Sequence, residues 1–485
     1  MTGPTGGRAG ERLVVVGAGM AATRLVEGLV AGGYPGRVTV VGEEEHAPYN
    51  RILLSAVLEG SHREDALTLR DPAWFADHGI DLRLGTRVAE VDREAGEVVL
   101  VDGHRIGWDR LVLATGAIPT LPPIRGLVGL DGRLHESVHA FRSVADCHRL
   151  LDRLAEGLPG RSVVVGGGLL GLQVARALAV RGVATEVVEG STHLLSGQVG
   201  EAAGAVLRRD LERLGTDVYT GVRAVRLTPD GLRLDNGVDL PTDLVVLTAG
   251  GRPSTALARR AGLMVRRGVV VGRWLESVTD ERVHALGDCA ERLGRTTGFV
   301  APAWEQAAVL AAHLCRGGEE AGSRVTGGYD GHRAVARLRA SGLEVAVLGE
   351  PETTPGDVVE VSNPLRGTYR KLVVRGGVIE AATLVGDLSH VGLVTQLFDR
   401  RTVLGPAEPG ALLMPPTPAV PVELPDDVEV CACAGVTAGA VRACGRLEEV
   451  RSRTRATTGC GGCEGVVRTL LAGGEPAGQA VGSTR

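Results

Sequence analysis

Aromatic residues are scarce in this sequence, at 3% of its 485 residues. The cores of its domains must therefore be built from Val, Leu, Ala and Ile, and an apolar content of 44% is sufficient for that. The length allows roughly three or four domains. Excess positive charge is also lacking, because the formal net charge is −5, and this argues against nucleic acid as a main partner.

Long apolar runs are missing as well. No segment approaches the roughly 20 residues that a membrane span requires, and residues 1–10 lack the apolar region of a secretory signal. We therefore expect a cytoplasmic protein with no membrane partner. In that compartment, paired cysteines indicate metal ligands or redox centres before structural disulfides.

Glycine, in contrast, is abundant, with 71 residues, which suits a backbone that closely approaches several ligands. The first glycine-rich turn, with Gly17, Gly19 and Ala22, follows the predicted strand 12–16 and opens a predicted helix. Glu43 ends the next predicted strand. The glycines would let a pyrophosphate approach the helix N-terminus, and the carboxylate would accept hydrogen bonds from ribose hydroxyls. This βαβ unit predicts a dinucleotide site.

A second turn of the same kind holds Gly166, Gly168 and Gly171, again between a Val-rich strand and a predicted helix. Glu189 ends its next strand, and the segment 190–193 directly after it contains no arginine. A carboxylate at this place favours the free ribose hydroxyl of NAD and repels the additional phosphate of NADP. We therefore favour NADH for this site.

The remaining chain changes character after about residue 330. Hairpins are predicted within 87–103 and 217–249, whereas 333–398 looks like a small α+β domain. Residues 405–425 contain seven prolines and little periodicity, which predicts an extended linker.

The tail after this linker has two close pairs of cysteines, which are Cys431 with Cys433 and Cys460 with Cys463. Four thiolates suit a 2Fe–2S cluster or a structural zinc ion, and the spacing alone leaves both open. Cys444, expected on a helix, is left out of this ligand set. The three other cysteines stand singly and are expected to be buried as small apolar residues; they are Cys147, Cys289 and Cys315.

Two dinucleotide units in one chain resemble the flavoproteins of the pyridine nucleotide-disulfide oxidoreductase class. Three further segments carry the resemblance, and they contain Thr115 with Gly116, Gly250, and Gly287 with Asp288. The resemblance implies FAD at the first turn and the nicotinamide at the second, with the Asp288 carboxylate on the ribityl chain of the flavin. The disulfide branch of the class carries a redox cysteine pair beside the flavin. This chain has none there, so hydride is expected to stop at FAD.

A closer resemblance, over about residues 11–470, is to the flavoprotein part of NADH-dependent nitrite reductase large subunits and to the electron-transfer subunit of assimilatory nitrate reductase. It is carried by segments 48–55, 302–307, 369–372 and 386–387 and by the cysteine tail. It implies that Arg51 lies near the flavin and that Glu305 and Gln306 pack by its isoalloxazine ring. The tail resembles BFD-like domains, which implies a 2Fe–2S cluster on Cys431, Cys433, Cys460 and Cys463.

One departure from this pattern concerns the terminal reductase. Nitrite reductase large subunits continue into a sirohaem and 4Fe–4S half with four more cysteines, and this sequence ends at Arg485 without them. We therefore expect nitrite reduction to require that centre from another subunit.

The predicted fold class is α/β, with two Rossmann-like dinucleotide-binding domains, a small α+β domain similar to the C-terminal domain of rubredoxin reductases, and a small helical 2Fe–2S module. The predicted boundaries are 11–125 with 250–325 for the FAD-binding domain, 126–249 for the NAD-binding domain, 326–404 for the α+β domain, 405–427 for the linker and 428–472 for the cluster module.

The predicted function is an NADH-dependent FAD and 2Fe–2S electron-transfer oxidoreductase. Its partner would be the catalytic subunit of a nitrate or nitrite reductase, and no side chain need act as a catalyst because the cofactors carry the chemistry. The alternatives are an NADH:rubredoxin or ferredoxin reductase, a flavin subunit of an amine or opine dehydrogenase complex, and a non-enzymatic redox sensor.

Overall fold

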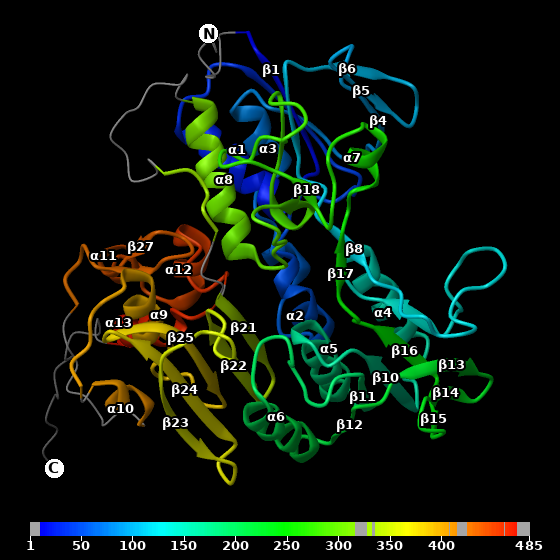
Figure 1. Ribbon diagram of the computed structural model, residues 1–485, viewed down its shortest axis with the longest axis vertical. Helices are drawn as coiled ribbons and strands as arrows, with labels where there is room; N and C mark the ends of the chain where they lie inside the picture. Colours follow the sequence, from blue (N-terminus) through cyan, green and yellow to red (C-terminus); the bar gives the residue numbers. More distant parts are fainter. Residues whose placement is uncertain are drawn as a thin grey trace, which may run out of the picture. The chain divides into compact units, whose positions relative to one another are not determined.

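The computed structural model describes residues 10–315, 327–331, 335–406, 408–414, 424–459 and 461–472. It divides into two compact units, Met1–Leu343 and Glu344–Arg485 (Figure 1).

The first unit begins with a five-stranded parallel sheet in the order β19-β7-β1-β2-β3. Its strands are β1 (Arg12–Val16), β2 (Arg37–Val41), β3 (Asp81–Arg83), β7 (Arg110–Leu113) and β19 (Val283–Ala285). The Val-rich strands are buried because helices cover a parallel sheet. Helices α1 (Met20–Ala31) and α8 (Val300–Cys315) pack together against this sheet. Strand β19 pairs with β7 although the whole second domain separates them in sequence.

A second five-stranded parallel sheet has the order β12-β11-β10-β16-β9. Its strands are β9 (Val138–Ala140), β10 (Arg161–Val165), β11 (Ala184–Glu189), β12 (Thr216–Thr220) and β16 (Leu244–Leu247), and its helices are α4 (Val144–Ala155), α5 (Leu169–Val180) and α6 (Glu201–Arg213). The units β1-α1-β2 and β10-α5-β11 have the same connection and the same parallel pairing. The two βαβ units predicted from the sequence are confirmed.

Smaller antiparallel elements complete this unit. The two predicted hairpins are present as β4 (Val88–Asp92), β5 (Glu97–Leu100) and β6 (Arg105–Gly107), and as β13 (Ala224–Thr228), β14 (Gly231–Leu234) and β15 (Asp239–Pro241). The chain leaves the first sheet through β8 (Ala117–Pro119) and returns through β17 (Gly251–Pro253), and these two strands pair antiparallel (Figure 1). The shorter helices are α2 (Leu54–Glu59), α3 (Pro72–Asp77), α7 (Ala256–Arg260) and the 3-10 turn η3 (Gly287–Cys289).

The small α+β domain is a five-stranded sheet in the order β21-β22-β25-β24-β23. Its elements are β21 (Val335–Ala340), β22 (Leu343–Leu348), β23 (Asp357–Asn363), β24 (Thr368–Arg375), β25 (Val378–Val385) and α9 (Val391–Arg400). A further helix, α10 (Glu408–Leu413), lies within the segment that the sequence suggested as an extended linker. Residues 415–423 of that segment lie outside the described residues.

Helix α10 forms there because the sheet holds its end. Arg370 is buried on β24, pairs with Asp387, and donates to the carbonyl oxygen of Leu413 over 2.6 Å. The ring Nδ1 of His390 lies 2.8 Å from the carbonyl oxygen of Leu412. The segments 369–372 and 386–387, which carried part of the family resemblance, therefore meet in one partly buried ion pair that supports the fold.

The C-terminal module consists of β26 (Glu429–Cys431), β27 (Val436–Thr437), α11 (Ala438–Arg442), α12 (Leu447–Thr454) and α13 (Glu464–Ala472). Its small core is made of valines and cysteines and includes Val441, Val450 and Val467. The expectation that Cys444 lies on a helix was wrong, because α11 ends at Arg442 and Cys444 follows in a turn. The predicted fold class is confirmed. None of the helices in the described ranges has the length and apolar character to cross a membrane.

Candidate cofactor sites

The first glycine turn joins β1 to α1 in a conformation that requires glycine. Gly17 has a φ of +112°, and a Cβ atom there would lie 2.2 Å from the carbonyl oxygen of Ala114 at the end of β7. Gly19 precedes the first turn of α1, and no side chain caps that helix. Ala22 is buried on the helix. The uncapped amides of α1 can therefore receive an anion such as a pyrophosphate.

Glu43 follows β2, at the edge where the turn between β1 and α1 also lies. Its side chain is 70% exposed and lies 3.6 Å from Arg87. A carboxylate at the end of this strand is suited to accept hydrogen bonds from ribose hydroxyls.

Asp288 lies in η3, beside the first turn of α1. Gly287 has a φ of +74°, and a Cβ atom there would lie 3.1 Å from the Cβ of Ala21. Arg142, which was not predicted, donates to the Asp288 carboxylate over 2.8 Å. Burial raises the pKa of Asp288, whereas the charges of Arg142 and Arg51 act in the opposite direction.

Gln306 holds this turn from α8. It is 2% exposed, and its Oε1 accepts the Gly287 amide over 2.7 Å. Its neighbour Glu305 is exposed on the same helix. Gln306 therefore contacts the Gly287–Asp288 turn directly.

Arg51 belongs to a hydrogen-bonded network. The sequence predicted a flavin role for Arg51 but not for the other members of the network. Its guanidinium lies 2.5 Å from a Glu44 carboxylate oxygen and donates to the carbonyl oxygen of Arg142 over 3.4 Å. The Tyr49 hydroxyl donates to Glu44 over 2.6 Å, and the guanidinium lies 5.2 Å from the Tyr49 ring centroid. Arg142 thus connects Arg51 to Asp288, which brings two of the predicted flavin residues into one cluster.

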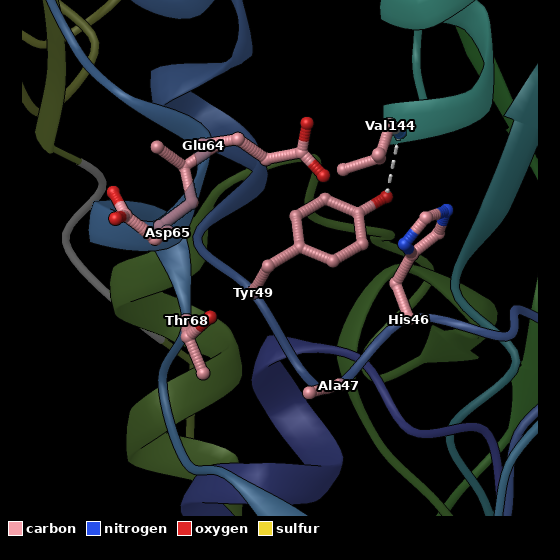
Figure 2. Close-up of a pocket in the computed structure, with 8 residues that line it drawn as sticks. His46, Ala47, Tyr49, Glu64, Asp65, Thr68 and Val144 are labelled. Atoms are coloured by element: carbon pink, nitrogen blue, oxygen red, sulfur yellow. Dashed lines mark hydrogen bonds between the residues drawn. The ribbon is translucent and has the colours of Figure 1, made fainter.

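Tyr49 also reaches the second domain. Its hydroxyl accepts the Val144 amide at the start of α4 over 3.1 Å, as Figure 2 shows. Beside it lies a cavity of about 340 Å³ lined by His46, Ala47, Tyr49, Glu64, Asp65, Leu67, Thr68 and Val144. Its lining combines residues that precede β3 with the first residue of α4.

Thr115 and Gly116 form hydrogen bonds with Ser254, where the chain returns from the second domain. The Thr115 hydroxyl donates to the carbonyl oxygen of Ser254 over 2.7 Å, and Gly116, with a φ of +63°, accepts the Ser254 amide over 2.9 Å. These contacts fix the junction between the two domains.

The second glycine turn repeats the geometry of the first. Gly166 has a φ of +118°, and a Cβ atom there would lie 2.7 Å from the carbonyl oxygen of Thr248. A Cβ atom at Gly171 would lie 1.8 Å from the carbonyl oxygen of Gly166, so no larger residue fits. At Gly168, before α5, a Cβ atom would meet no protein atom within 4 Å. Glycine at 168 therefore leaves room for a ligand.

Glu189 faces this turn. Its two carboxylate oxygens accept the amides of Gly167 and Ser191, both over 2.7 Å. Gly250, with a φ of +86°, accepts the Thr120 amide over 3.0 Å at the start of β17. Through its bonds to the Gly167 and Ser191 amides, Glu189 stabilises the loops at this turn, and it lies where a ribose is expected.

Three of the four predicted cluster ligands are described, and they share one small core. Cys431 and Cys463 are 4% and 7% exposed, and Cys433 packs against the same cluster. Cys460 lies outside the described residues. Within the described part of the chain, no three His, Cys, Asp or Glu side chains form a metal-binding group.

The loop before Cys460 adds a donor for sulfur. The Thr457 amide donates to the Cys463 Sγ over 3.3 Å, and a Cβ atom at Gly459 would lie 3.4 Å from the Cβ of Cys433. Soft thiolates with amide hydrogen bonds suit an iron–sulfur cluster. The residues therefore fit a 2Fe–2S centre, which Cys431, Cys433, Cys460 and Cys463 would hold.

The single cysteines have the expected surroundings in two of three cases. Cys147 and Cys289 are buried, and burial raises the pKa of the Cys147 thiol to about 11. Cys315 is only partly buried, although its thiol donates to the carbonyl oxygen of Leu29.

Comparison with protein families agrees with this geometry. Residues 11–308 match the family model for pyridine nucleotide-disulphide oxidoreductases, and residues 429–473 match the model for the BFD-like [2Fe-2S] binding domain.

Curated relatives extend the match along 95% of the chain. Nitrite reductase [NAD(P)H] of Bacillus subtilis (strain 168) is 33% identical, and 57% of its length is covered. The assimilatory nitrate reductase electron transfer subunit of the same organism is 30% identical, with 59% covered. The chain thus spans a little over half the length of these relatives.

Among solved structures, the covalent putidaredoxin reductase–putidaredoxin complex contains a chain that matches 84% of this one with a TM-score of 0.74 and 25% identity. The match covers 96% of that chain. This protein is therefore an NAD(P)H-dependent FAD oxidoreductase with a BFD-like 2Fe–2S domain, and it belongs to the pyridine nucleotide-disulphide oxidoreductase family.

Proposed function

We propose that this protein oxidises NADH and delivers the electrons singly to the catalytic subunit of a nitrate or nitrite reductase. The flavin supplies the change from hydride to single-electron chemistry, and the cluster supplies a one-electron exit. One observation carries the proposal. The same chain contains two glycine turns, each followed by a helix without a side-chain cap, and a module with a core of cysteines.

The residues of the chain have separate roles in this proposal. The α1 and α5 N-termini bind the two pyrophosphates, and Glu43 and Glu189 orient the riboses. Asp288, held by Arg142 and by the turn that Gln306 fixes, positions the flavin. Arg51 places a positive charge in the same cluster, which would stabilise a reduced and anionic flavin.

The partner is proposed from the relatives. Two of them are named as a nitrite reductase and as an electron transfer subunit of a nitrate reductase. Because one of them is itself named an electron transfer subunit, we propose that a separate catalytic subunit receives the electrons.

A paired substitution tests the electron route. Cys463→Ser removes a proposed ligand, whereas Cys444→Ala changes a buried cysteine of the same core outside the ligand set. We expect C463S to lose the electron paramagnetic resonance signal of the reduced cluster and electron delivery, while NADH still bleaches the flavin. C444A should retain all three. Normal delivery by C463S without a cluster signal would contradict the relay.

A second candidate is an NADH:ferredoxin or rubredoxin reductase. It is favoured because the match to the chain from the putidaredoxin reductase–putidaredoxin complex covers 96% of that chain. Purified protein with its cluster removed distinguishes the two. A reductase for a soluble carrier would still reduce ferredoxin or rubredoxin from the flavin, whereas the relay proposed here would not.

A further inference from the structure

The segment directly after Glu189 contains no arginine, but an arginine from another loop lies beside the predicted nucleotide site. The side chain of Arg223, from the loop after β12, lies against Gly190. We propose that Arg223 is the residue that binds the 2′-phosphate when the nucleotide is NADPH. This inference rests on the proposed nucleotide role of the turn around Gly166 and deepens it.

The backbone places Arg223 firmly beside the loop after β11. The Gly221 amide donates to the carbonyl oxygen of Ser191 over 2.7 Å, and the Val222 amide donates to that of Glu189 over 3.3 Å. The two loops therefore run together at the carboxyl ends of neighbouring parallel strands, which is where a doubly wound fold binds the ribose of a dinucleotide.

The other side of Arg223 is fixed as well. Its amide donates to the Asp235 carboxylate over 3.0 Å, and the Asp235 amide donates to the Arg223 carbonyl oxygen over 2.9 Å. A Cβ atom at Gly190 would lie 3.1 Å from both Cγ and Nε of Arg223. Glycine at 190 thus gives the arginine side chain the space to lie across this loop.

The charges at this place are distributed so that the arginine remains available. Both carboxylate oxygens of Glu189 accept backbone amides. Arg223 is exposed, and among the residues that the structure describes no carboxylate pairs with its guanidinium. A guanidinium binds a phosphate with two parallel hydrogen bonds. Glu189 would receive the hydroxyl of NADH, and Arg223 would offset its repulsion of the phosphate of NADPH.

A binding experiment on the flavin-loaded full chain tests this directly. Adenosine 2′,5′-bisphosphate and AMP, which differ only in the 2′-phosphate, are titrated by calorimetry into wild type, Arg223→Ala and Arg226→Ala. We expect R223A to weaken binding of the bisphosphate about tenfold, or about 1.4 kcal/mol, and that of AMP less than twofold. R226A, which changes an exposed arginine three residues further on, should match wild type.

A second variant keeps the test independent of the first. Gly190→Ala leaves the arginine in the chain but displaces its side chain, so the bisphosphate should again be weakened relative to AMP. If R223A leaves the ratio of the two affinities unchanged, or lowers both equally, the proposal is wrong. Binding requires no electron acceptor, so failure of electron delivery would count against the proposed function alone.

Discussion

At the residue scale, the candidate flavin site depends on ion pairs between distant parts of the sequence. Arg142 and Asp288 form an ion pair with each other. Their side chains are only 25% and 24% exposed, so each holds the other in a partly buried position. A partly buried charge that loses its partner costs more than an exposed one.

Asp288→Asn tests this pair. The variant keeps the shape of the side chain but removes its charge, so we expect FAD binding to weaken at least about tenfold, since a hydrogen bond to a charged group contributes about 1.5–3 kcal/mol. The flavin-to-protein absorbance ratio after gel filtration measures it. Asp239→Asn, which breaks an exposed ion pair with Arg233, is the matched control and should retain its flavin.

His284 predicts an acid sensitivity of the first domain. It is fully buried on β19, and burial lowers its pKa to about 3, from about 6.5 in an unfolded chain. Below about pH 6.5, the His284 imidazole therefore binds a proton in the unfolded state but stays neutral in the native state. The contribution of His284 alone should lower the free energy of unfolding by about 1.4 kcal/mol per pH unit from there towards pH 3.

Urea unfolding of wild type and His284→Leu at pH 7 and pH 5 measures this contribution. The leucine variant should lose less stability between the two pH values. An equal loss in both proteins would show that other groups cause the acid sensitivity.

At the scale of elements, the glycine turns were predictable from the sequence because their requirements are local. A motif of three small residues between a strand and a helix determines the backbone at Gly17 and at Gly166 alike. The acids beside the ends of the next strands, Glu43 after β2 and Glu189 at the end of β11, follow from the same unit.

Contacts between elements were not predictable in this way. Glu44, Tyr49 and Arg142 join the flavin cluster through a loop and a second domain, and Arg223 reaches Gly190 from the loop after β12. No periodic pattern marks such positions. Helix α10 was missed because prolines dominate its surroundings, whereas a buried arginine on a distant strand holds its end.

Two glycines of one turn should respond differently to alanine. At Gly171 a methyl group would overlap the Gly166 carbonyl oxygen, so Gly171→Ala should distort the turn and lower the melting temperature. At Gly168 a methyl group meets no protein atom, so Gly168→Ala should fold and bind FAD normally. Its KM for NADH should rise at least about tenfold, because the methyl group would occupy the place of the pyrophosphate. Melting curves and steady-state kinetics with ferricyanide separate the two effects, and a normal KM for G168A would argue against nucleotide binding here.

At the scale of the whole molecule, the predicted FAD and NAD residues lie in the first unit and the predicted cluster ligands in the second. A chain ending at Met414 retains the small α+β sheet with α10 and removes the cluster module. We expect this chain to oxidise NADH with ferricyanide at close to the wild-type rate and to give no electrons to the partner reductase. Equal activity with the partner in both chains would place the electron exit at the flavin.

The pairing of β7 with β19 has a consequence for how the protein is made. Leu111 and Val283 become neighbours only after the whole inserted domain has left the ribosome, and closing so long a loop favours slow folding. Asp288 and Gln306 follow β19 in the chain. The proposed flavin site is therefore incomplete in a nascent chain until the nucleotide domain has been synthesised.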